Sequence, residues 1–343
     1  MAGVGTAHLR PADEMLLQVT DLHVEYPAGR GRTVRAVSGV SFDVAEGETL
    51  GLVGESGCGK STTARAVLQL PRPTSGTVVF DGVDLTTLRG EELRRVRTGL
   101  QMIFQDPIAS LNPRREVGDI VREGLDIWPD HRYRDREGGD AAVPATDRVR
   151  AVLGSVGMDL DEVGTRRPHE FSGGQCQRIC IARALVLDPR VLICDEPVSA
   201  LDVSIQAQIL NLLEDLKELY GLTMLFIAHD LAVVKNISDR VCVMYLGRIC
   251  EIGPTDAIFE RPAHPYTDAL LASIPQLDPG SGAEEDVLTG DPPSPFDVPS
   301  GCRFRTRCPR ATELCTEQVP ELSEVSDGRF VACHFPLTGD PAQ

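Results

Sequence analysis

The sequence has no run of about 18 apolar residues, so it predicts no membrane-spanning helix. Its first nineteen residues hold no apolar core of about 7–15 residues behind a basic end, which argues against a secretory signal. Basic residues are also few: the chain has 34 Lys and Arg and 51 Asp and Glu, which gives a formal charge of −17. A nucleic-acid partner usually requires a basic surface, so we expect none. These features indicate a soluble cytoplasmic protein.

Lysine is nearly absent, with three residues against 31 arginines. One of the three is Lys60, which lies in a glycine-rich segment where a compact ammonium is not replaceable by a planar guanidinium. With 343 residues, 42% of them apolar, the chain can form one large domain or two smaller ones.

The segment around Lys60 matches the phosphate-binding pattern G-x-x-x-x-G-K-[ST]. An apolar strand over 50–53 precedes it, and a helix over 60–70 follows, stopped by Pro71. In such a loop the backbone N–H groups surround a phosphate, the lysine reaches the β- and γ-phosphates, and the hydroxyl after it binds Mg²⁺. The predicted ATP-binding residues here are Gly54, Glu55, Ser56, Gly57, Cys58, Gly59, Lys60, Ser61 and Thr62.

A second motif, "VLICDEP", is a buried strand that ends in two carboxylates. The carboxyl end of a parallel strand is where ligands bind in such sheets. We expect Asp195 to support the Mg²⁺ and Glu196 to polarise the attacking water. Together with the phosphate loop, this motif predicts a nucleoside triphosphatase.

A third motif, "EFSGGQCQRICIARAL", places Ser-Gly-Gly at the start of an amphipathic helix. An N-capped helix would explain it, and so would a second anion-binding helix N-terminus. Two phosphate-binding loops in one chain make sense if two subunits face each other and each completes the other's site.

From Leu16 to Ser273 these motifs resemble, in order, an ATP-binding cassette (ABC) subunit. Phe171 stands where the family more often has leucine. The resemblance implies an α/β P-loop NTPase (RecA-like) cassette with a helical subdomain. It also implies ATP and Mg²⁺ as ligands, with Lys60, Glu196 and His229 as the catalytic residues. The further roles that it implies are an adenine-stacking Tyr26, a Gln105 that contacts Mg²⁺ together with Ser61, a signature motif at Ser172, Gly173, Gly174 and Gln175, and a D-loop Asp202.

Several stretches, among them "FQDPIASLNPR", "DEPVSALDVS" and "HPYTDALLASIP", are similar to the F-type ATPases of oligopeptide and dipeptide importers. This resemblance implies a subunit that hydrolyses ATP to power peptide import at the cytoplasmic face of the membrane. Its expected partners are a second, D-type cassette, two membrane permeases and an extracytoplasmic peptide-binding protein. A soluble ABC-type ATPase with a regulatory or repair role is the alternative.

The expected organisation is a cassette over 14–274, with its helical subdomain at about 106–182. A linker with six prolines over 275–300 should then separate the cassette, and Lys60 with it, from a cysteine-rich extension over 301–336. The charged stretch 129–145 is expected to be a solvated loop.

The extension holds four cysteines in the spacing C-x5-C-x6-C-x17-C, namely Cys302, Cys308, Cys315 and Cys333. It is too small to bury a core of its own and needs another means of stabilisation. A reducing compartment disfavours disulfides, and structural zinc sites favour closer pairs. A [4Fe–4S] cluster also takes four thiolates, and the related importers imply one here. A zinc site and four thiols without a metal are the alternatives to this cluster. The other six cysteines are expected to be small buried apolar residues.

Overall fold

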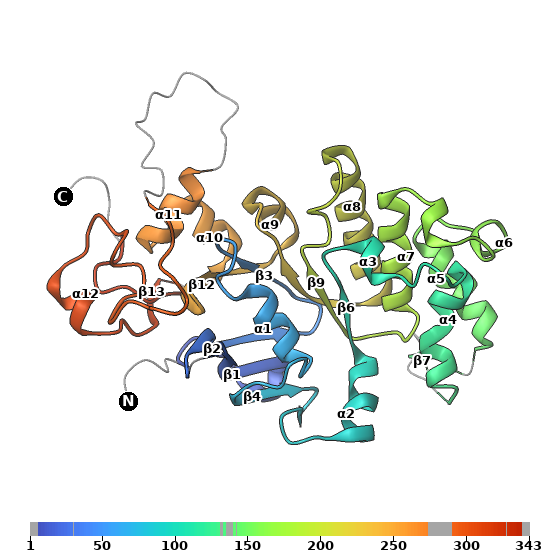
Figure 1. Ribbon diagram of the computed structural model, residues 1–343, viewed down its shortest axis with the longest axis horizontal. Helices are drawn as coiled ribbons and strands as arrows, with labels where there is room; N and C mark the ends of the chain where they lie inside the picture. The colour runs from blue at the N-terminus through green and yellow to red at the C-terminus, as the bar shows by residue number, and fades with distance from the viewer. Residues whose placement is uncertain are drawn as a thin grey trace. The chain divides into compact units, whose positions relative to one another are not determined.

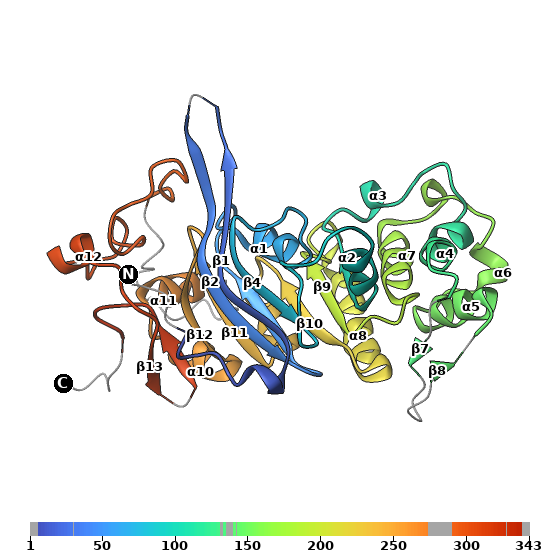
Figure 2. The same cartoon turned by 90° about the horizontal axis from the view of Figure 1, so that it is seen from below.

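The computed structural model describes residues 6–29, 31–130, 133–134, 140–141, 143–273, 290–326 and 328–337 (Figures 1 and 2). The chain forms two compact units. The first unit combines residues 1–88 with 227–343, and the second spans 89–226. Most of the predicted linker, residues 275–289, and the middle of the charged stretch 129–145 lie outside the described residues.

An antiparallel sheet begins the first unit, with strand order β2-β1-β4-β5. Its strands are β1 (Met15–Pro27), β2 (Thr33–Ala45), β4 (Ser75–Phe80) and β5 (Val83–Asp84). Leu17 and Val19 lie opposite Val44 and Phe42, and all four side chains are buried. Because alternate residues of a strand share one face, this pattern gives the sheet a single apolar face.

The other strands of this unit follow the order β13-β14-β12-β11-β3. They are β3 (Thr49–Val53), β11 (Arg240–Tyr245), β12 (Arg248–Pro254), β13 (Ser323–Ser326) and β14 (Arg329–Val331). Strands β3 and β11 are parallel, whereas β14 pairs antiparallel with β12 through Val331 and Phe330. The extension therefore continues the cassette's own sheet with its last two strands, as Figure 2 shows.

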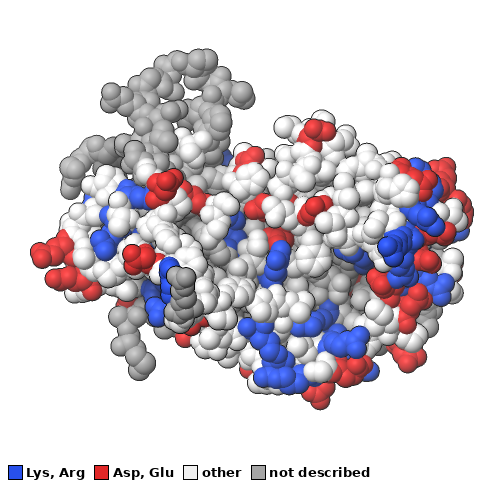
Figure 3. Space-filling model, in the orientation of Figure 1, with Lys and Arg blue, Asp and Glu red and all other residues white. Residues whose placement is uncertain are grey.

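Helices α1 (Lys60–Val67), α9 (Leu231–Ile237), α10 (Thr255–Glu260), α11 (Pro265–Ala272) and α12 (Glu313–Glu317), with the 3₁₀ turn η1 (Ala12–Glu14), complete this unit. Helix α11 starts at a proline behind His264, whose side chain accepts a hydrogen bond from the Tyr266 N–H. A proline at the first position is suited to a helix start because its missing N–H would have no helical partner there. Acidic side chains gather around α12 on the face drawn in Figure 3.

A buried carboxylate links the N-terminal segment to the sheets of this unit. Asp43 is fully buried and accepts hydrogen bonds from the Arg10 guanidinium at 2.7 Å and from the Arg240 guanidinium at 2.9 Å. Burial would raise the pKa of Asp43, but the Arg10 backbone N–H and the Arg240 charge outweigh it and hold this pKa below its ordinary value. Both arginines also contact Glu48.

The second unit has strands in the order β10-β9-β6, with β6 (Leu100–Ile103) parallel to β9 (Val191–Asp195). Strand β10 spans Thr223–Ile227. Two short strands, β7 (Tyr133–Arg134) and β8 (Asp140–Ala141), form a separate pair. All five side chains of β9 are buried, which explains its continuous apolar run, since a central parallel strand is covered on both faces.

Helix α7 (Gly173–Leu185) lies at the centre of the helical part and packs against α3, α4 and α5. The helices of this unit are α2 (Gly90–Val96), α3 (Pro107–Ser110), α4 (Val117–Ile127), α5 (Ala145–Ser155), α6 (Leu160–Val163), α7 and α8 (Val203–Tyr220), with 3₁₀ turns η2 (Arg97–Gly99) and η3 (Pro168–Glu170). None of the helices in the described part of the chain combines the length and apolarity that a membrane span needs.

Candidate nucleotide-binding and catalytic residues

The phosphate loop lies between β3 and α1 in the first unit, as the sequence predicts. Gly54 and Gly59 both have positive φ, +146° and +106°, and an added Cβ would meet the Met244 carbonyl oxygen at 2.1 Å or the Ala36 carbonyl oxygen at 2.4 Å. Only glycine fits at these two positions. Ser56 and Gly57 form the exposed tip of the loop, and Ser61 and Thr62 are half-buried on the first turn of α1.

Lys60 points back into the loop. Its Nζ donates to the carbonyl oxygens of Gly54 at 2.7 Å and Glu55 at 3.1 Å, and its side chain is buried. Cys58 is also buried, which raises the pKa of its thiol. A buried ammonium surrounded by backbone carbonyls is suited to exchange these neutral partners for phosphate oxygens, with which it forms stronger charge-assisted hydrogen bonds.

Glu55 is held from two other places in the first unit. The Arg307 guanidinium donates to both of its carboxylate oxygens, at 2.7 and 3.0 Å, and the Glu55 N–H donates to the Tyr266 hydroxyl at 2.8 Å. The expectation that the linker separates the extension from the phosphate loop is therefore wrong. The sequence gives no sign of this contact, because Arg303, Arg305 and Arg307 alternate between cysteines and nothing in their spacing distinguishes Arg307.

Two further predicted residues of the first unit lie at element ends. Tyr26 lies near the end of β1 with 38% of its surface exposed, a position from which its ring can meet a planar ligand. His229 is exposed between the end of β10 and the start of α9, where Asp230 caps the helix by accepting from the Ala232 N–H. Their roles stay predictions.

In the second unit the catalytic carboxylate follows β9. Asp195 is the last residue of β9 and is fully buried, whereas Glu196 is half-buried and has a φ of +49°. A non-glycine residue in this left-handed region costs roughly 1–3 kcal/mol, and such conformations cluster at functional sites. The Gln105 amide nitrogen donates to the Glu196 carboxylate at 2.7 Å. Two predicted site residues that are 91 positions apart are thus in direct contact.

The Ser-Gly-Gly segment of the same unit forms a capping box at the start of α7. The Ser172 hydroxyl accepts from the Gln175 N–H at 3.3 Å, and the Gln175 side-chain oxygen accepts from the Ser172 N–H at 2.9 Å. An added Cβ on Gly174 would meet the Ile205 side chain at 2.7 Å, so glycine allows α7 to approach the start of α8 closely. Asp202, the residue before α8, is exposed, as are Ser172 and Gln175.

The cysteines fall into the two groups that the sequence predicts. Cys58, Cys176, Cys180, Cys194, Cys242 and Cys250 are buried, as expected for small apolar residues. The four cysteines of the extension all line one cavity. Burial and the neighbouring thiols raise the pKa of Cys333 to about 11. In the described ranges, no group of three or more His, Cys, Asp or Glu side chains is arranged to hold a metal ion.

Comparison with known proteins decides the family. Residues 37–199 match the ABC transporter family, and residues 250–315 match the oligopeptide/dipeptide transporter C-terminal region. The chain is 50% identical to the oligopeptide transport ATP-binding protein OppF of Salmonella typhimurium, over 93% of this chain and 96% of that protein. It belongs to the ATP-binding subunits of the oligopeptide/dipeptide ABC transporter family.

A second curated relative of this ABC subunit is the oligopeptide transport ATP-binding protein AppF of Bacillus subtilis, 48% identical over 94% of this chain and 98% of that one. Among solved structures, it is similar to a dimeric ATP-binding cassette in a post-hydrolysis state bound to ADP and Pi. That match has a TM-score of 0.60 and 26% identity, and covers 70% of this chain and 98% of that one. The structure of cbiO1 from Clostridium perfringens also gives a TM-score of 0.60, at 28% identity, over 72% of this chain and 91% of that one. The predicted cassette fold and the ATPase class of the chain are thereby confirmed.

Proposed function

We propose that this ATPase powers the import of oligopeptides or dipeptides through an ABC transporter. The observation that carries the proposal is that the similarity does not stop at the cassette. It continues through the C-terminal region typical of oligopeptide and dipeptide transporters, over residues 250–315. A soluble regulatory or repair ATPase would not require this region, so transport is favoured over that alternative.

The positions of the predicted site residues support the following chemical roles. Lys60, buried in its loop, exchanges the Gly54 and Glu55 carbonyls for phosphate oxygens of ATP. Glu196 orients and polarises the water that attacks the γ-phosphate, and His229 donates a hydrogen bond to a γ-phosphate oxygen. Tyr26 stacks on the adenine.

The Mg²⁺ implied by the family would be held by the Ser61 hydroxyl and the Gln105 carbonyl oxygen, with Asp195 supporting it. These are oxygen donors, which suit Mg²⁺, and Ser61 lies half-buried on the first turn of α1 directly behind the loop. When bound, the ion would neutralise charge on the phosphates.

Two chains are required for one complete site in this proposal. Ser172 and Gln175 are exposed at the N-terminus of α7, and so is Asp202. From there they can face the ATP of a second, D-type cassette, whose signature motif would in turn face Lys60 of this chain. The pair would dock on two membrane permeases at the cytoplasmic face, fed by an extracytoplasmic peptide-binding protein.

Co-expression of the tagged chain with its permeases and the second cassette tests these partners. All of them should co-purify, and ATP turnover of the isolated chain should be low and should rise when the partners are added. Full, concentration-independent turnover by a purified monomer would contradict the proposal.

For the extension, we propose a [4Fe–4S] cluster bound by Cys302, Cys308, Cys315 and Cys333. The donor set supports it: four thiols line one cavity, and none of the four forms a disulfide. A bound cluster would cross-link a segment too small to fold by apolar burial alone.

Protein purified without oxygen should be brown and contain about four iron atoms per chain. Replacing any one of the four cysteines with serine should remove the colour, whereas Cys250→Ser should not. Stoichiometric zinc without iron would contradict the cluster and support the zinc alternative. Protein without any bound metal would show that the four cysteines are free thiols.

A further inference from the structure

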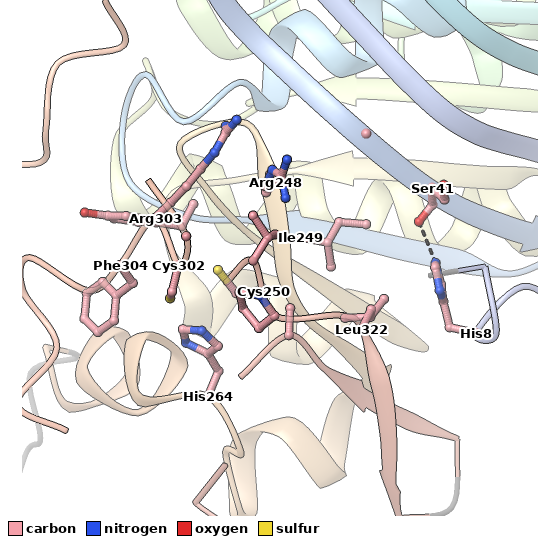
Figure 4. Close-up of a pocket in the computed structure, with 16 residues that line it drawn as sticks. His8, Ser41, Arg248, Ile249, Cys250, His264, Cys302, Arg303, Phe304 and Leu322 are labelled. Atoms are coloured by element: carbon pink, nitrogen blue, oxygen red, sulfur yellow. Dashed lines mark hydrogen bonds between the residues drawn. The ribbon is translucent and has the colours of Figure 1, made fainter. Parts of the chain in front are cut away.

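The segment between the first two cysteines of the extension is seated in the first unit beside the phosphate loop. Phe304 is 2% exposed, and its ring centroid lies 5.3 Å from those of both Tyr245 and Tyr266. Figure 4 shows Cys302, Arg303 and Phe304 beside His264 and Cys250, which belong to the cassette. The Arg303 guanidinium donates to the Leu246 carbonyl oxygen, in the turn after β11. This packing fixes where Arg307, three residues after Phe304, can reach.

Arg307 reaches the loop itself. Its side chain is only 4% exposed, and it forms a two-point ion pair with Glu55, which is the residue directly after Gly54 in the phosphate-binding pattern. It also donates to the Tyr245 hydroxyl at 3.3 Å. A two-point pair between a guanidinium and a carboxylate fixes direction as well as charge. The Glu55 backbone is held at the same time by Tyr266 and Lys60.

We propose that Arg307 is a positioning residue for nucleotide binding, through which the cysteine-rich extension sets the affinity of the phosphate loop for ATP. The proposal rests on ATP binding at residues 54–61 and not on transport. Arg307 holds the Glu55 carboxylate on the extension's side of the loop and neutralises it. Without Arg307, a negative charge next to the cradle would repel the triphosphate, and Coulomb repulsion is poorly screened for partly buried groups.

The coupling is reciprocal. If a docked extension favours ATP binding, bound ATP must favour the docked extension by the same factor. Mg-ATP should therefore slow the proteolytic cleavage of the extension, and this protection should disappear when Arg307 is removed.

Calorimetric titration of the full-length chain with Mg-ATP tests the proposal. Arg307→Ala should bind ATP about tenfold more weakly than wild type. Arg305→Ala is the matched control, because Arg305 lies two residues away and its guanidinium donates to the carbonyl oxygen of Ser300, the residue just before the extension, and not to the phosphate loop. It should bind ATP like wild type.

A double variant separates charge from folding. In the Arg307→Ala background, Glu55→Gln removes the uncompensated charge and should restore most of the lost affinity, and the single Glu55→Gln variant completes the thermodynamic cycle. Equal affinity of Arg307→Ala and wild type, or a double variant as weak as Arg307→Ala, would overturn the proposal. Failure of the wild type to bind Mg-ATP would overturn the ATP-binding assignment, and the proposal with it.

Discussion

The Gln105 amide nitrogen donates a hydrogen bond to the Glu196 carboxylate at 2.7 Å. Gln105, which is proposed to contact Mg²⁺, is thus hydrogen-bonded to Glu196, the proposed catalytic base. A hydrogen bond from an amide N–H fixes the direction of a carboxylate. The nitrogen of the Gln105 amide makes this contact, and the oxygen of the same amide is the atom proposed to contact Mg²⁺. The pair thus connects the placement of the base to the arrival of the nucleotide.

Gln105→Ala should reduce ATP turnover by about 10- to 100-fold in the assembled transporter, because a misplaced catalytic group costs about that much. ATP affinity should change less. Gln101→Ala is the control: Gln101 lies on β6, and its amide donates to the Arg97 carbonyl oxygen. Steady-state hydrolysis with separate binding measurements checks this. Equal turnover of the Gln105 and Gln101 variants would contradict it.

Asp43 should make the stability of the chain depend on acid pH. Its folded pKa lies below the unfolded value of about 3.9, so its contribution is fully present above that value and is lost as pH falls through the folded pKa. Asp43→Asn should lower the free energy of unfolding by about 3 kcal/mol at pH 7. Urea unfolding from pH 7 to pH 3 should show the gap between variant and wild type narrowing below about pH 4.

The control for Asp43 is Asp161→Asn. Asp161 pairs with Arg150 at 2.7 Å on the surface, where exposed ion pairs contribute little, so its unfolding midpoint should stay close to that of wild type. A constant gap between Asp43→Asn and wild type across this pH range would rule out the proposed linkage.

Phe304→Ala should release the extension from the cassette. Truncating a buried phenylalanine costs about 3–5 kcal/mol, and most of the ring's neighbours belong to the cassette. Hydrogen exchange of residues 301–317 should become at least tenfold faster, while exchange in β9 should stay unchanged. Phe296→Ala, whose ring is 47% exposed, should leave the exchange of residues 301–317 unchanged. Unchanged exchange in the Phe304 variant would show that this packing does not hold the extension.

The sequence predicted the local elements of the site well, because each motif carries its own physical signal. The glycines of the phosphate loop with the helix predicted after it, the Ser-Gly-Gly start of a helix and the apolar run of β9 all indicate the elements found there, namely α1, α7 and β9. These signals are local in the chain and need no tertiary contact to be recognised.

The long-range contacts were not predictable in the same way. The ion pair between Glu55 and Arg307 joins residues 252 positions apart, and either side chain alone is ordinary. The pairing of β14 with β12 is equally hidden, since three-residue strands carry no periodicity to recognise. The aromatic cluster has no clearer signal: Tyr266 and Phe304 are buried, whereas Phe296, another aromatic residue in polar sequence surroundings, is 47% exposed.

The most direct test of the account is ATP hydrolysis coupled to peptide uptake in vesicles that contain the complete transporter, with Glu196→Gln introduced in this chain. The substitution keeps the shape of the side chain and removes the carboxylate that polarises the water. Mg-ATP should still bind, while turnover at this site falls by about 10²–10⁴-fold and uptake stops. Glu218→Gln, a matched change on the exposed side of α8, should leave both activities as they are. Turnover and uptake by Glu196→Gln within about threefold of wild type would contradict the assignment of Glu196 and the mechanism built on it.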